Sequence, residues 1–313
     1  MRILFWGTPE FALPSLRALT EEGHAVLAVV TQPDRPAGRG RVVRPGPVKR
    51  AATAEGIPVL QPVKPRGDEF VECIRALEPD LSVVAAYGHL LPEEVLHLPR
   101  LGSLNVHASL LPKLRGAAPI NWTIIRGHER TGVSIMRMVA EMDAGPVLHQ
   151  MAIGLGPDVT AGELSQMLAE LGATALIEVL TMLESGAPTE VEQDHARATF
   201  APKLTRETAR LDWTLPATEL SRWIRGCDPW PGGWSSLGGR PVQLFQPSVD
   251  AAGDTGSEGP PGTVVWADPR EGVAVRTGQD LIRIGEVKPA GRARMSAAAW
   301  VRGRGVQTGD RFV

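Results

Sequence analysis

The stretch SLNVHASLLP, residues 103–112, decides how the first half of this chain folds. Its apolar residues are those of a buried strand, yet it carries an asparagine and a histidine two residues apart. Side chains alternate between the faces of a strand, so Asn105 and His107 point to one face and Val106 to the other. A central strand of a parallel sheet is normally apolar on both faces. The polar pair is therefore either a hydrogen-bonded part of the core or a functional site, and the stretch alone leaves both open.

The segments around this stretch alternate between strands and helices. Apolar runs predict further strands at residues 2–7, 25–31, 81–88, 132–139 and 146–155. Helical patterns fall at residues 13–23, 47–56, 68–78, 118–127 and 160–186. The last of these helices begins with Thr160 and Glu163 at the spacing of a capping box. This alternation predicts an α/β, Rossmann-like domain, with helices on both faces of a mostly parallel sheet and ligands beyond the carboxyl ends of the strands.

The composition and the pattern of the sequence change after residue 187. Residues 188–206 are polar and irregular, which is typical of a linker. A helix is predicted at 215–226, and short strands separated by Gly, Pro and Asp turns are predicted at 241–247, 262–267, 272–277 and 280–287. We therefore expect a first domain at 1–187, a linker at 188–206, and a small antiparallel, OB-like β-barrel domain at 207–313.

Length and composition suit a two-domain protein of a reducing compartment. The chain has 313 residues, of which 43% are apolar and 22% charged, as in ordinary globular proteins. Cys73 and Cys227 lie far apart and fit no metal or redox spacing, so we expect the protein to be cytoplasmic. We see no signal peptide and no uninterrupted apolar run of about 18 residues, and therefore expect no membrane partner.

Positive charge is concentrated in two segments, although the formal net charge is only −2. Residues 34–50 carry six Lys and Arg against one Asp, and residues 283–313 carry seven against one Glu and one Asp. Two such segments can hold phosphates without making the whole surface bind polyanions. Solvated faces are the ordinary alternative, and the predominance of arginine favours phosphate contact.

Several common catalytic patterns are absent from the sequence. The first predicted strand is followed by GTPEFALPS, which lacks the second and third glycines of the dinucleotide fingerprint. The patterns HExxH, GxxxxGKS/T and GxSxG do not occur, and the seven histidines show no metal-ligand pairing. We therefore expect no metal, and a dinucleotide oxidoreductase has only the type of sheet in its favour.

An amide, an imidazole and a carboxylate together suit acyl transfer to an amine. The amide donates to a developing oxyanion, and the imidazole moves a proton between two nitrogens. The carboxylate orients the imidazole and favours its charged form. Asn105 and His107 supply the first two groups. The third can come from Glu141 or Asp143, which follow the strand at 132–139, and the residues alone do not decide between them.

Seven motifs occur in the order and spacing of one enzyme family. They are FWGTPEFALPSL (5–16), TQPDRPAGRGR (31–41), VVAAYGHLLP (83–92), LNVHASLLPKLRGAAPI (104–120), MDAGPVL (142–148), DPWPGGW (228–234) and PAGRARMSA (289–297). Through them the chain resembles the methionyl-tRNA formyltransferases over nearly its whole length. The pattern Asn-x-His-x-Ser-Leu-Leu-Pro is shared by all 10-formyltetrahydrofolate formyltransferases. The basic loop and the barrel motifs narrow the resemblance to the tRNA enzymes.

The resemblance implies an activity and a set of site residues. The family transfers the formyl group of its co-substrate, 10-formyltetrahydrofolate, to the α-amino group of methionine esterified to initiator tRNA, which serves translation initiation. By their positions in the motifs, the catalytic residues are Asn105, His107 and Asp143. The residues expected to bind the folate are Leu90, Ser109, Leu110, Leu111, Pro112 and Val139.

The same resemblance implies RNA contacts in both basic segments. The loop at 34–50 matches one that enters the acceptor stem of the tRNA, and its expected contacts are Arg35, Arg39 and Arg41. The barrel resembles the family's tRNA-holding domain. We expect a monomer whose partners are initiator methionyl-tRNA and the folate. One local departure is Ala108, where some relatives carry glycine, and its side chain points away from the polar face.

Two further functions compete with this interpretation. One is formylation of a small amine, such as an amino sugar nucleotide or glycinamide ribonucleotide, and the linker, the barrel and the arginine-rich loop argue against it. The other is an inert RNA-binding protein on a degenerate enzyme fold, and the complete set of Asn, His and Asp argues against that.

Overall fold

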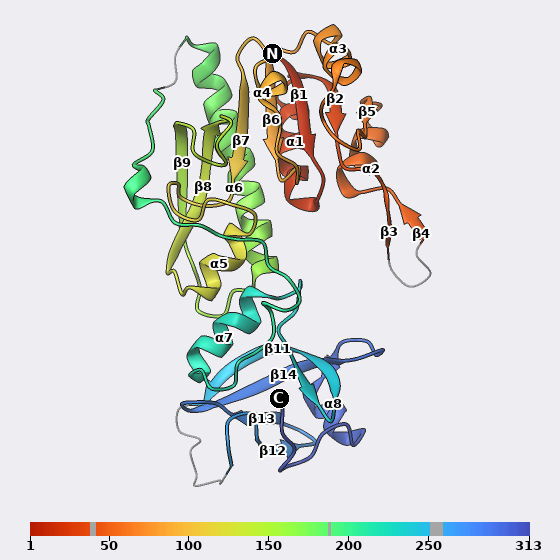
Figure 1. The fold of residues 1–313 in the computed structure, drawn as a ribbon, viewed down its shortest axis with the longest axis vertical. Coiled ribbons are helices and arrows are strands. Elements are labelled where there is room, and N and C mark those ends of the chain that lie inside the picture. Colours follow the sequence, from red (N-terminus) through yellow and green to blue (C-terminus); the bar gives the residue numbers. More distant parts are fainter. Residues whose placement is uncertain (38–41, 187–188, 251–258) are drawn as a thin grey trace. The chain divides into compact units, whose positions relative to one another are not determined.

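The computed structural model describes residues 1–37, 42–186, 189–250 and 259–313, which form two compact units (Figure 1). The first unit comprises Met1–Pro119, Arg130–Gly154 and Ser165–Pro202, and the second comprises Ile120–Glu129, Leu155–Leu164 and Lys203–Val313. Most of the expected linker thus packs within the first unit. Folding of residues 1–187 and 207–313 as separate domains stays a prediction.

The first unit is built on a seven-stranded sheet in the order β5-β2-β1-β6-β7-β8-β9. The strands are β1 (Arg2–Gly7), β2 (Ala25–Val30), β5 (Val59–Leu60), β6 (Leu81–Ala85), β7 (Ser103–His107), β8 (Arg130–Arg137) and β9 (Val147–Gly154). The first five strands in the sheet order run parallel, whereas β8 and β9 add an antiparallel pair. The predicted mostly parallel sheet is confirmed, with the stretch at 103–107 as an inner strand.

Helices cover both faces of this sheet. They are α1 (Leu13–Glu21), α2 (Pro47–Ala54), α3 (Asp68–Ala76), α4 (Glu93–Leu96) and most of α6 (Ala161–Glu184), with 3-10 turns η1 (Glu10–Ala12) and η2 (His195–Arg197). On one face, α3 and α4 enclose a buried cluster around Trp6 and Val84. On the other face, α6 approaches β7 so closely that a Cβ on Gly172 would lie 2.7 Å from Val106 Cγ1. The two faces of β7 therefore meet different helices.

Helix α6 begins with the predicted capping box. The backbone nitrogen of Thr160 donates to Glu163 Oε2 at 2.9 Å, and Glu163 N donates to Thr160 Oγ1 at 3.3 Å. In the described part of the chain, α6 is the one helix whose length and composition alone would allow it to cross a membrane. The core helix of a soluble protein passes the same test, and Leu168 and Leu176 of α6 are fully buried.

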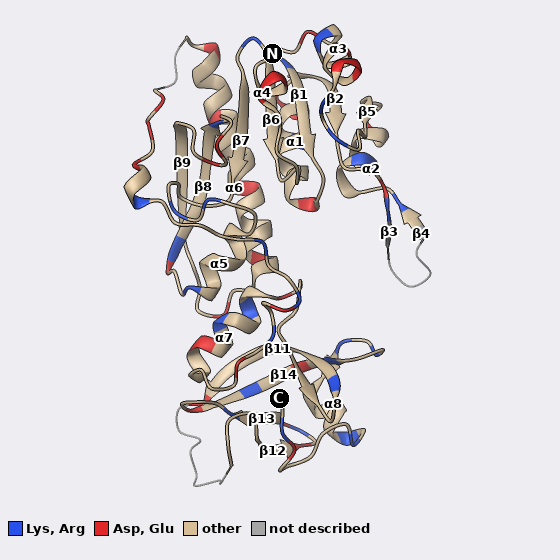
Figure 2. Ribbon diagram, in the orientation of Figure 1, with Lys and Arg blue, Asp and Glu red and all other residues tan. Residues whose placement is uncertain are grey.

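The basic loop has a structure that its sequence did not predict. Its two arms form a small antiparallel hairpin of β3 (Arg35–Ala37) and β4 (Val42–Arg44). Acidic and basic residues adjoin one another at its base (Figure 2). There Lys49 Nζ donates to Asp34 Oδ2 and to Gln61 Oε1, each at 2.6 Å. Lys49 therefore helps to fix the base of the hairpin.

The second unit contains the predicted small antiparallel β domain. Its strands follow the order β10-β11-β14-β13-β12, and β15 pairs with β14. They are β10 (Trp234–Leu237), β11 (Arg240–Asp250), β12 (Val264–Asp268), β13 (Gly272–Arg276), β14 (Leu281–Pro289) and β15 (Met295–Ser296). Val313 and Ser236 exchange backbone hydrogen bonds of 2.9 and 3.0 Å, and Val264 N donates to Asp310 O at 2.8 Å. Residues 310–313 thus join β10 to β12 and close the sheet into a barrel.

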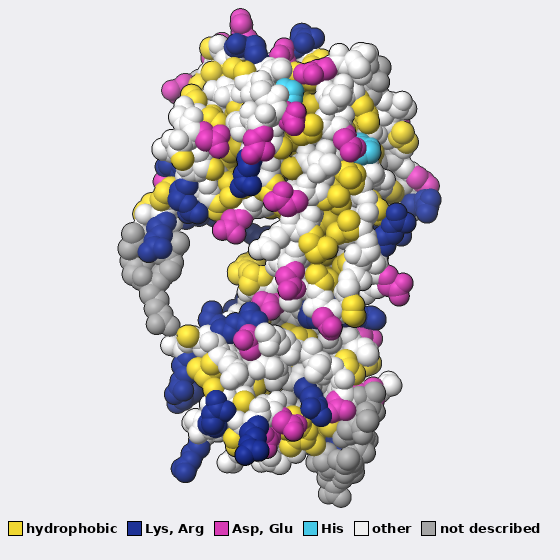
Figure 3. Space-filling view, turned by 180° about the vertical axis from the view of Figure 1, so that it is seen from behind, with side chains coloured by type: hydrophobic (Ala, Val, Ile, Leu, Met, Phe, Trp, Pro, Cys, Tyr) yellow, Lys and Arg dark blue, Asp and Glu magenta, His cyan; other side chains and the backbone are white. Residues whose placement is uncertain are grey.

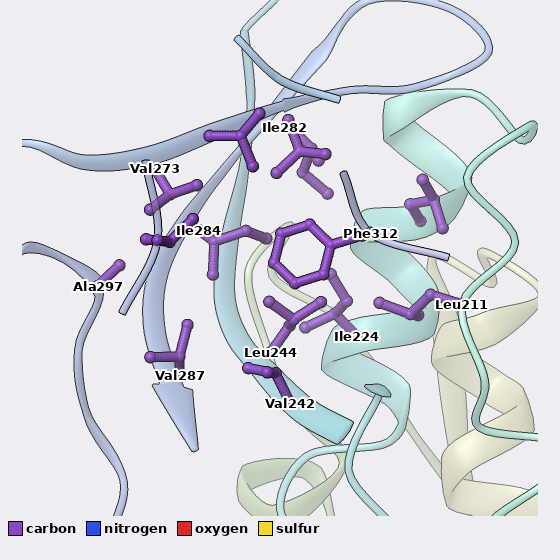
Figure 4. Packing of buried hydrophobic residues seen from close by; sticks show 14 of the residues in the cluster. Leu211, Ile224, Val242, Leu244, Val273, Ile282, Ile284, Val287, Ala297 and Phe312 are labelled. Carbon is purple, nitrogen blue, oxygen red and sulfur yellow. The ribbon is translucent and has the colours of Figure 1, made fainter. Parts of the chain in front are cut away.

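The barrel core is packed around Phe312, which lies among Leu211, Ile224 and Leu244 (Figure 4). The Phe312 ring stacks on Trp213 with 5.3 Å between the ring centroids. Helices α5 (Pro119–Ile125), α7 (Ala217–Gly226) and α8 (Ala297–Arg302) complete the elements.

Candidate active site

Asn105 and His107 lie on the same face of β7. Ser103, two residues before Asn105, donates from its hydroxyl to Leu96 O in α4 at 2.9 Å, which places this set on the α4 side of the sheet. Val106 meets α6 on the opposite side. His107 is the last residue of β7, so the pair lies at the carboxyl end of a parallel strand, where such sheets bind ligands.

Protein groups contact both nitrogens of the His107 ring. Nε2 lies 3.1 Å from the carbonyl oxygen of Leu114, and because a carbonyl only accepts, Nε2 carries the hydrogen of that bond. Nδ1 lies 3.7 Å from Asp143 Oδ2. The ring is 5% exposed, so its orientation is fixed by these contacts and not by solvent. In this orientation Nδ1 and Asp143 attract each other only when a proton lies on one of the two.

The carboxylate of Asp143 is held from a second direction. Asp143 lies in the connection between β8 and β9, and its Oδ2 accepts a hydrogen bond of 2.8 Å from Gly116 N. Glu141, the other candidate, has a side chain 72% exposed and lies 3.8 Å from Arg115 Nη1. The structure thus brings Asp143, and not Glu141, to the imidazole.

Three of the seven non-glycine residues with a left-handed backbone in the described part of the chain lie around these residues. Ala86, which follows β6, and Leu114 and Asp143 adopt left-handed conformations with φ of +49°, +60° and +52°. Such conformations are uncommon for residues other than glycine and persist only where the surrounding structure imposes them. Leu114 supplies the carbonyl to His107 and Asp143 the carboxylate, so strain and candidate chemistry coincide.

Asn105 is positioned by the sheet and leaves its carboxamide unused. Its backbone is paired with Val84 on one side and Met136 on the other. Within residues 1–37, 42–186, 189–250 and 259–313, the Asn105 side chain makes no hydrogen bond to protein groups, and it is partly exposed. A fixed, unsatisfied amide donor beside a buried imidazole can stabilise negative charge that develops on a bound acyl group.

The turn after β7 holds itself together through Ser109 and Leu111. Ser109 Oγ donates to Lys113 O at 2.6 Å, and its carbonyl accepts from Ser134 Oγ at 2.6 Å. Leu111 N donates to Ser134 Oγ, and its carbonyl accepts from Gln150. Both side chains are buried, whereas Leu110 and Pro112 are partly exposed. The contacts of these four residues with a folate stay a prediction.

Leu90 and Val139 both have exposed apolar side chains, at 73% and 37%. Leu90 follows the carboxyl end of β6, the neighbour of β7, and Val139 lies in the connection between β8 and β9 that carries Asp143. The turn around Leu90 is tied to the strand ends, because Tyr87 O accepts hydrogen bonds of 3.2 Å from Thr8 Oγ1 and Gln32 Nε2. Exposed apolar groups on an anchored turn fit an aromatic ligand such as a pteridine.

The predicted RNA contacts are only partly covered by the structure. Arg35 is exposed on β3 and donates to Gln32 Oε1 at 3.1 Å. Arg39 and Arg41 lie outside the described residues. In the second unit, Lys288, Arg292 and Arg304 are exposed and make no side-chain hydrogen bond or ion pair with the rest of the described chain. Figure 3 shows basic side chains spread over the visible face of this unit.

Leu114 and Gly116 are contributors that the sequence did not reveal. They act through a backbone carbonyl and a backbone N–H, groups that nearly every residue possesses. The one clue in the sequence is the glycine at position 116. In the structure Gly116 has φ +120°, and a Cβ there would lie 2.8 Å from Ala201 O, so a side chain would not fit.

Two family matches agree with this fold and site. Residues 1–180 match the family described as formyl transferase, and residues 203–305 match the C-terminal domain of formyl transferases. The fold and the site therefore define a formyl transferase.

Curated relatives narrow this class. The chain is 46% identical over 303 residues to the methionyl-tRNA formyltransferase of Desulfotalea psychrophila, covering 97% of this chain and 93% of that protein. It is 44% identical over 310 residues to the methionyl-tRNA formyltransferase of Bacillus subtilis, with coverages of 99% and 96%. The chain belongs to the methionyl-tRNA formyltransferase family.

Solved structures share the fold. A crystal structure of HypX from Aquifex aeolicus in complex with tetrahydrofolic acid superposes with a TM-score of 0.68 at 22% identity. The match covers 96% of this chain and 47% of the HypX chain, so this chain spans about half of that protein.

Proposed function

We propose that the protein transfers the formyl group of 10-formyltetrahydrofolate to the α-amino group of methionine esterified to initiator tRNA. The observation that carries this proposal is a buried His107 placed between the Leu114 carbonyl and the Asp143 carboxylate, in a chain of this family. Such a group moves protons without itself forming a covalent bond to the substrate.

Each catalytic side chain has one task in the transfer. The uncharged methionyl amine attacks the formyl carbon, a new C–N bond forms, and the bond from that carbon to the folate nitrogen breaks. Asn105 donates a hydrogen bond to the formyl oxygen as negative charge develops there. His107 accepts the proton of the incoming amine on Nδ1 and delivers it to the departing nitrogen, while Asp143 stabilises the charged ring. No serine or cysteine nucleophile is needed.

The residues around Asn105, His107 and Asp143 fit the folate donor. Leu90, which follows β6, and Val139, which follows β8, offer apolar surface next to the two strands that flank β7. Leu110 and Pro112 present their side chains from the turn after β7. Buried Ser109 and Leu111 set the shape of that turn. The donor supplies the formyl group, and the residues named here would hold and orient it.

RNA binding completes the proposal. The basic loop at residues 34–50, with Arg35, Arg39 and Arg41, would contact the acceptor stem, and the barrel would hold the body of the tRNA with exposed cations such as Lys288 and Arg292. On this view residues 1–187 form the catalytic domain, residues 188–206 connect it to the barrel at 207–313, and the protein works as a cytoplasmic monomer.

A comparison of acceptors tests the function. The protein is mixed with 10-formyltetrahydrofolate and either charged initiator tRNA, an amino sugar nucleotide or glycinamide ribonucleotide, and loss of the formyl group from the folate is followed. We expect turnover with the charged tRNA. Turnover with a small amine but not with the tRNA would overturn the proposal, and RNA binding without any turnover would indicate an inert binding protein.

The catalytic role of His107 is tested separately. We expect His107→Ala to lower single-turnover formylation by about 10²- to 10⁴-fold, because a positioned proton carrier is lost. His97→Ala is the matched control, since His97 is exposed on the surface after α4. A rate for His107→Ala within about threefold of the parent would refute the assignment.

A further inference from the structure

The segment at residues 191–201, expected from its sequence to be part of a linker, is hydrogen-bonded to the turn that holds His107. Leu114 N donates to Thr199 Oγ1 at 2.9 Å, and Arg115 N donates to Thr199 O at 2.8 Å. Ala201 N donates to Arg115 O at 2.7 Å. The segment therefore fixes the Leu114 carbonyl, which binds the His107 ring.

The same segment also reaches the connection that carries Asp143, through the side chain of Gln193. Gln193 Nε2 donates to Asp143 O at 2.9 Å and to Gly145 O at 2.7 Å. Its Oε1 accepts from Arg115 Nε and Nη2 at 3.1 and 2.8 Å. The amide is 7% exposed and uses both donors and both acceptor sites, so it is fixed in orientation.

Arg115 is the group that orients Gln193, and its burial is unusual. The residue is 2% exposed, and its remaining contacts are His195 Nδ1 at 3.2 Å and Glu141 Oε1 at 3.8 Å. A buried guanidinium beside a neutral amide is not an arrangement that maximises stability, because desolvating the charge is costly. It does, however, connect the turn after β7 to the connection between β8 and β9.

We propose that Gln193 is a positioning residue for the transfer reaction, held by Arg115 and acting through Asp143. Asp143 has a left-handed backbone at φ +52°, a conformation that is uncommon for residues other than glycine. Gln193 supports it by binding the carbonyls of residues 143 and 145. The carboxylate is thereby kept near His107 Nδ1, where it favours the charged ring during proton transfer. This inference rests on the proposed function, since it assigns Asp143 its catalytic task.

Gln193→Glu tests the proposal. The new side chain keeps the acceptors for Arg115 but loses both donors to the Asp143 connection. We expect kcat for formylation of methionyl-tRNA to fall by about 10- to 100-fold, because misplacement by about 1 Å is sufficient for such a loss. The KM values for tRNA and folate should change little, whereas the two buried carbonyls left without a donor should lower the midpoint of thermal unfolding. Gln166→Glu, the same change at an exposed position of α6, is the matched control.

Combination with Asp143→Asn separates positioning from general stability. If Gln193 acts through Asp143, Gln193→Glu should cost little further activity in the Asp143→Asn background, so that the two effects are far from additive. Additive effects, or a kcat for Gln193→Glu within about threefold of the parent, would overturn the positioning role. Should Gln193→Glu not fold, Gln193→Met is put through the same cycle. An Asp143→Asn variant with parental kcat would instead refute the catalytic assignment in the proposed function.

Discussion

Asp143 has a left-handed backbone at the point where its carboxylate reaches His107. Aspartate and asparagine tolerate this conformation better than other residues with a Cβ, because their short polar side chains bond locally. Glu141 instead points its side chain to solvent, with its carboxylate 3.8 Å from Arg115. Backbone shape and chemistry therefore both favour Asp143, a choice that residue types alone left open.

A substitution of Gly116 tests how the backbone N–H that binds Asp143 is held in place. Gly116→Ala would place a methyl group 2.8 Å from Ala201 O on a backbone with φ +120°, and would disturb the N–H that binds Asp143. We expect the free energy of unfolding to fall by about 1–3 kcal/mol, measured by urea denaturation, and formylation to fall with it.

The control for this substitution is Gly156→Ala, because a Cβ on Gly156 would meet nothing within 4 Å. Equal stabilities of Gly116→Ala and Gly156→Ala would contradict the steric argument.

Among the elements, the β3–β4 hairpin has an ion pair between Lys49 and Asp34 at its base. Hydrogen bonds from Lys49 and Gln61 lower the pKa of Asp34 below its ordinary value. A lowered pKa in the folded state means that the ionised form stabilises the base above the ordinary carboxyl pKa, and that this support is lost only as the pH falls through the lowered value. Asp34 is thus ionised and can accept the hydrogen bonds of Lys49 and Gln61 throughout the neutral range.

A substitution of Arg39 tests whether the basic loop at residues 34–50 contacts the tRNA. If it contacts the acceptor stem, Arg39→Ala should lower kcat/KM for charged initiator tRNA by about 10-fold or more, as measured in steady-state formylation assays. Arg66→Ala, an exposed arginine outside the hairpin, is the control. An unchanged kcat/KM for Arg39→Ala would remove this residue from the recognition set.

Elements with strong local patterns were predictable from the sequence. The capping pair Thr160 and Glu163 marked the start of α6, and apolar runs marked the strands of the parallel sheet. The β3–β4 hairpin was missed because each arm has only three residues and one contains Pro36, which is typical of a loop. The short helix α8 was missed for the same reason, since six residues give little periodicity.

For the whole molecule, the barrel depends on a residue close to the end of the sequence. Phe312 is 1% exposed and contacts the rings of Trp213 and Trp300. We expect Phe312→Ala to lower the free energy of unfolding by about 3–5 kcal/mol, as seen when a large buried aromatic side chain is removed. Val313→Ala, at a position 54% exposed, should cost little by the same urea measurement.

A cost for Phe312→Ala close to that of Val313→Ala would show that Phe312 is not central to the barrel core.

The limit of sequence prediction lies in contacts between distant segments. Alternation along one strand placed Asn105 and His107 on the same face, because that geometry is local. Contacts such as Gln193 with Asp143, or Val313 with Ser236, join residues 50 or more positions apart and leave no local pattern. The shared face of Asn105 and His107 could thus be predicted, whereas the groups that support His107 and the closure of the barrel could not.

Closure of the barrel also bears on behaviour at high concentration. Residues 310–313 pair with Ser236 of β10, and Asp310 O accepts from Val264 N at the start of β12; in an open sheet such backbone groups would be free to pair with strands from other molecules. Release of these four residues would expose two unpaired strand edges at once. Damage to this short segment should therefore first become visible as concentration-dependent self-association, before the barrel itself unfolds.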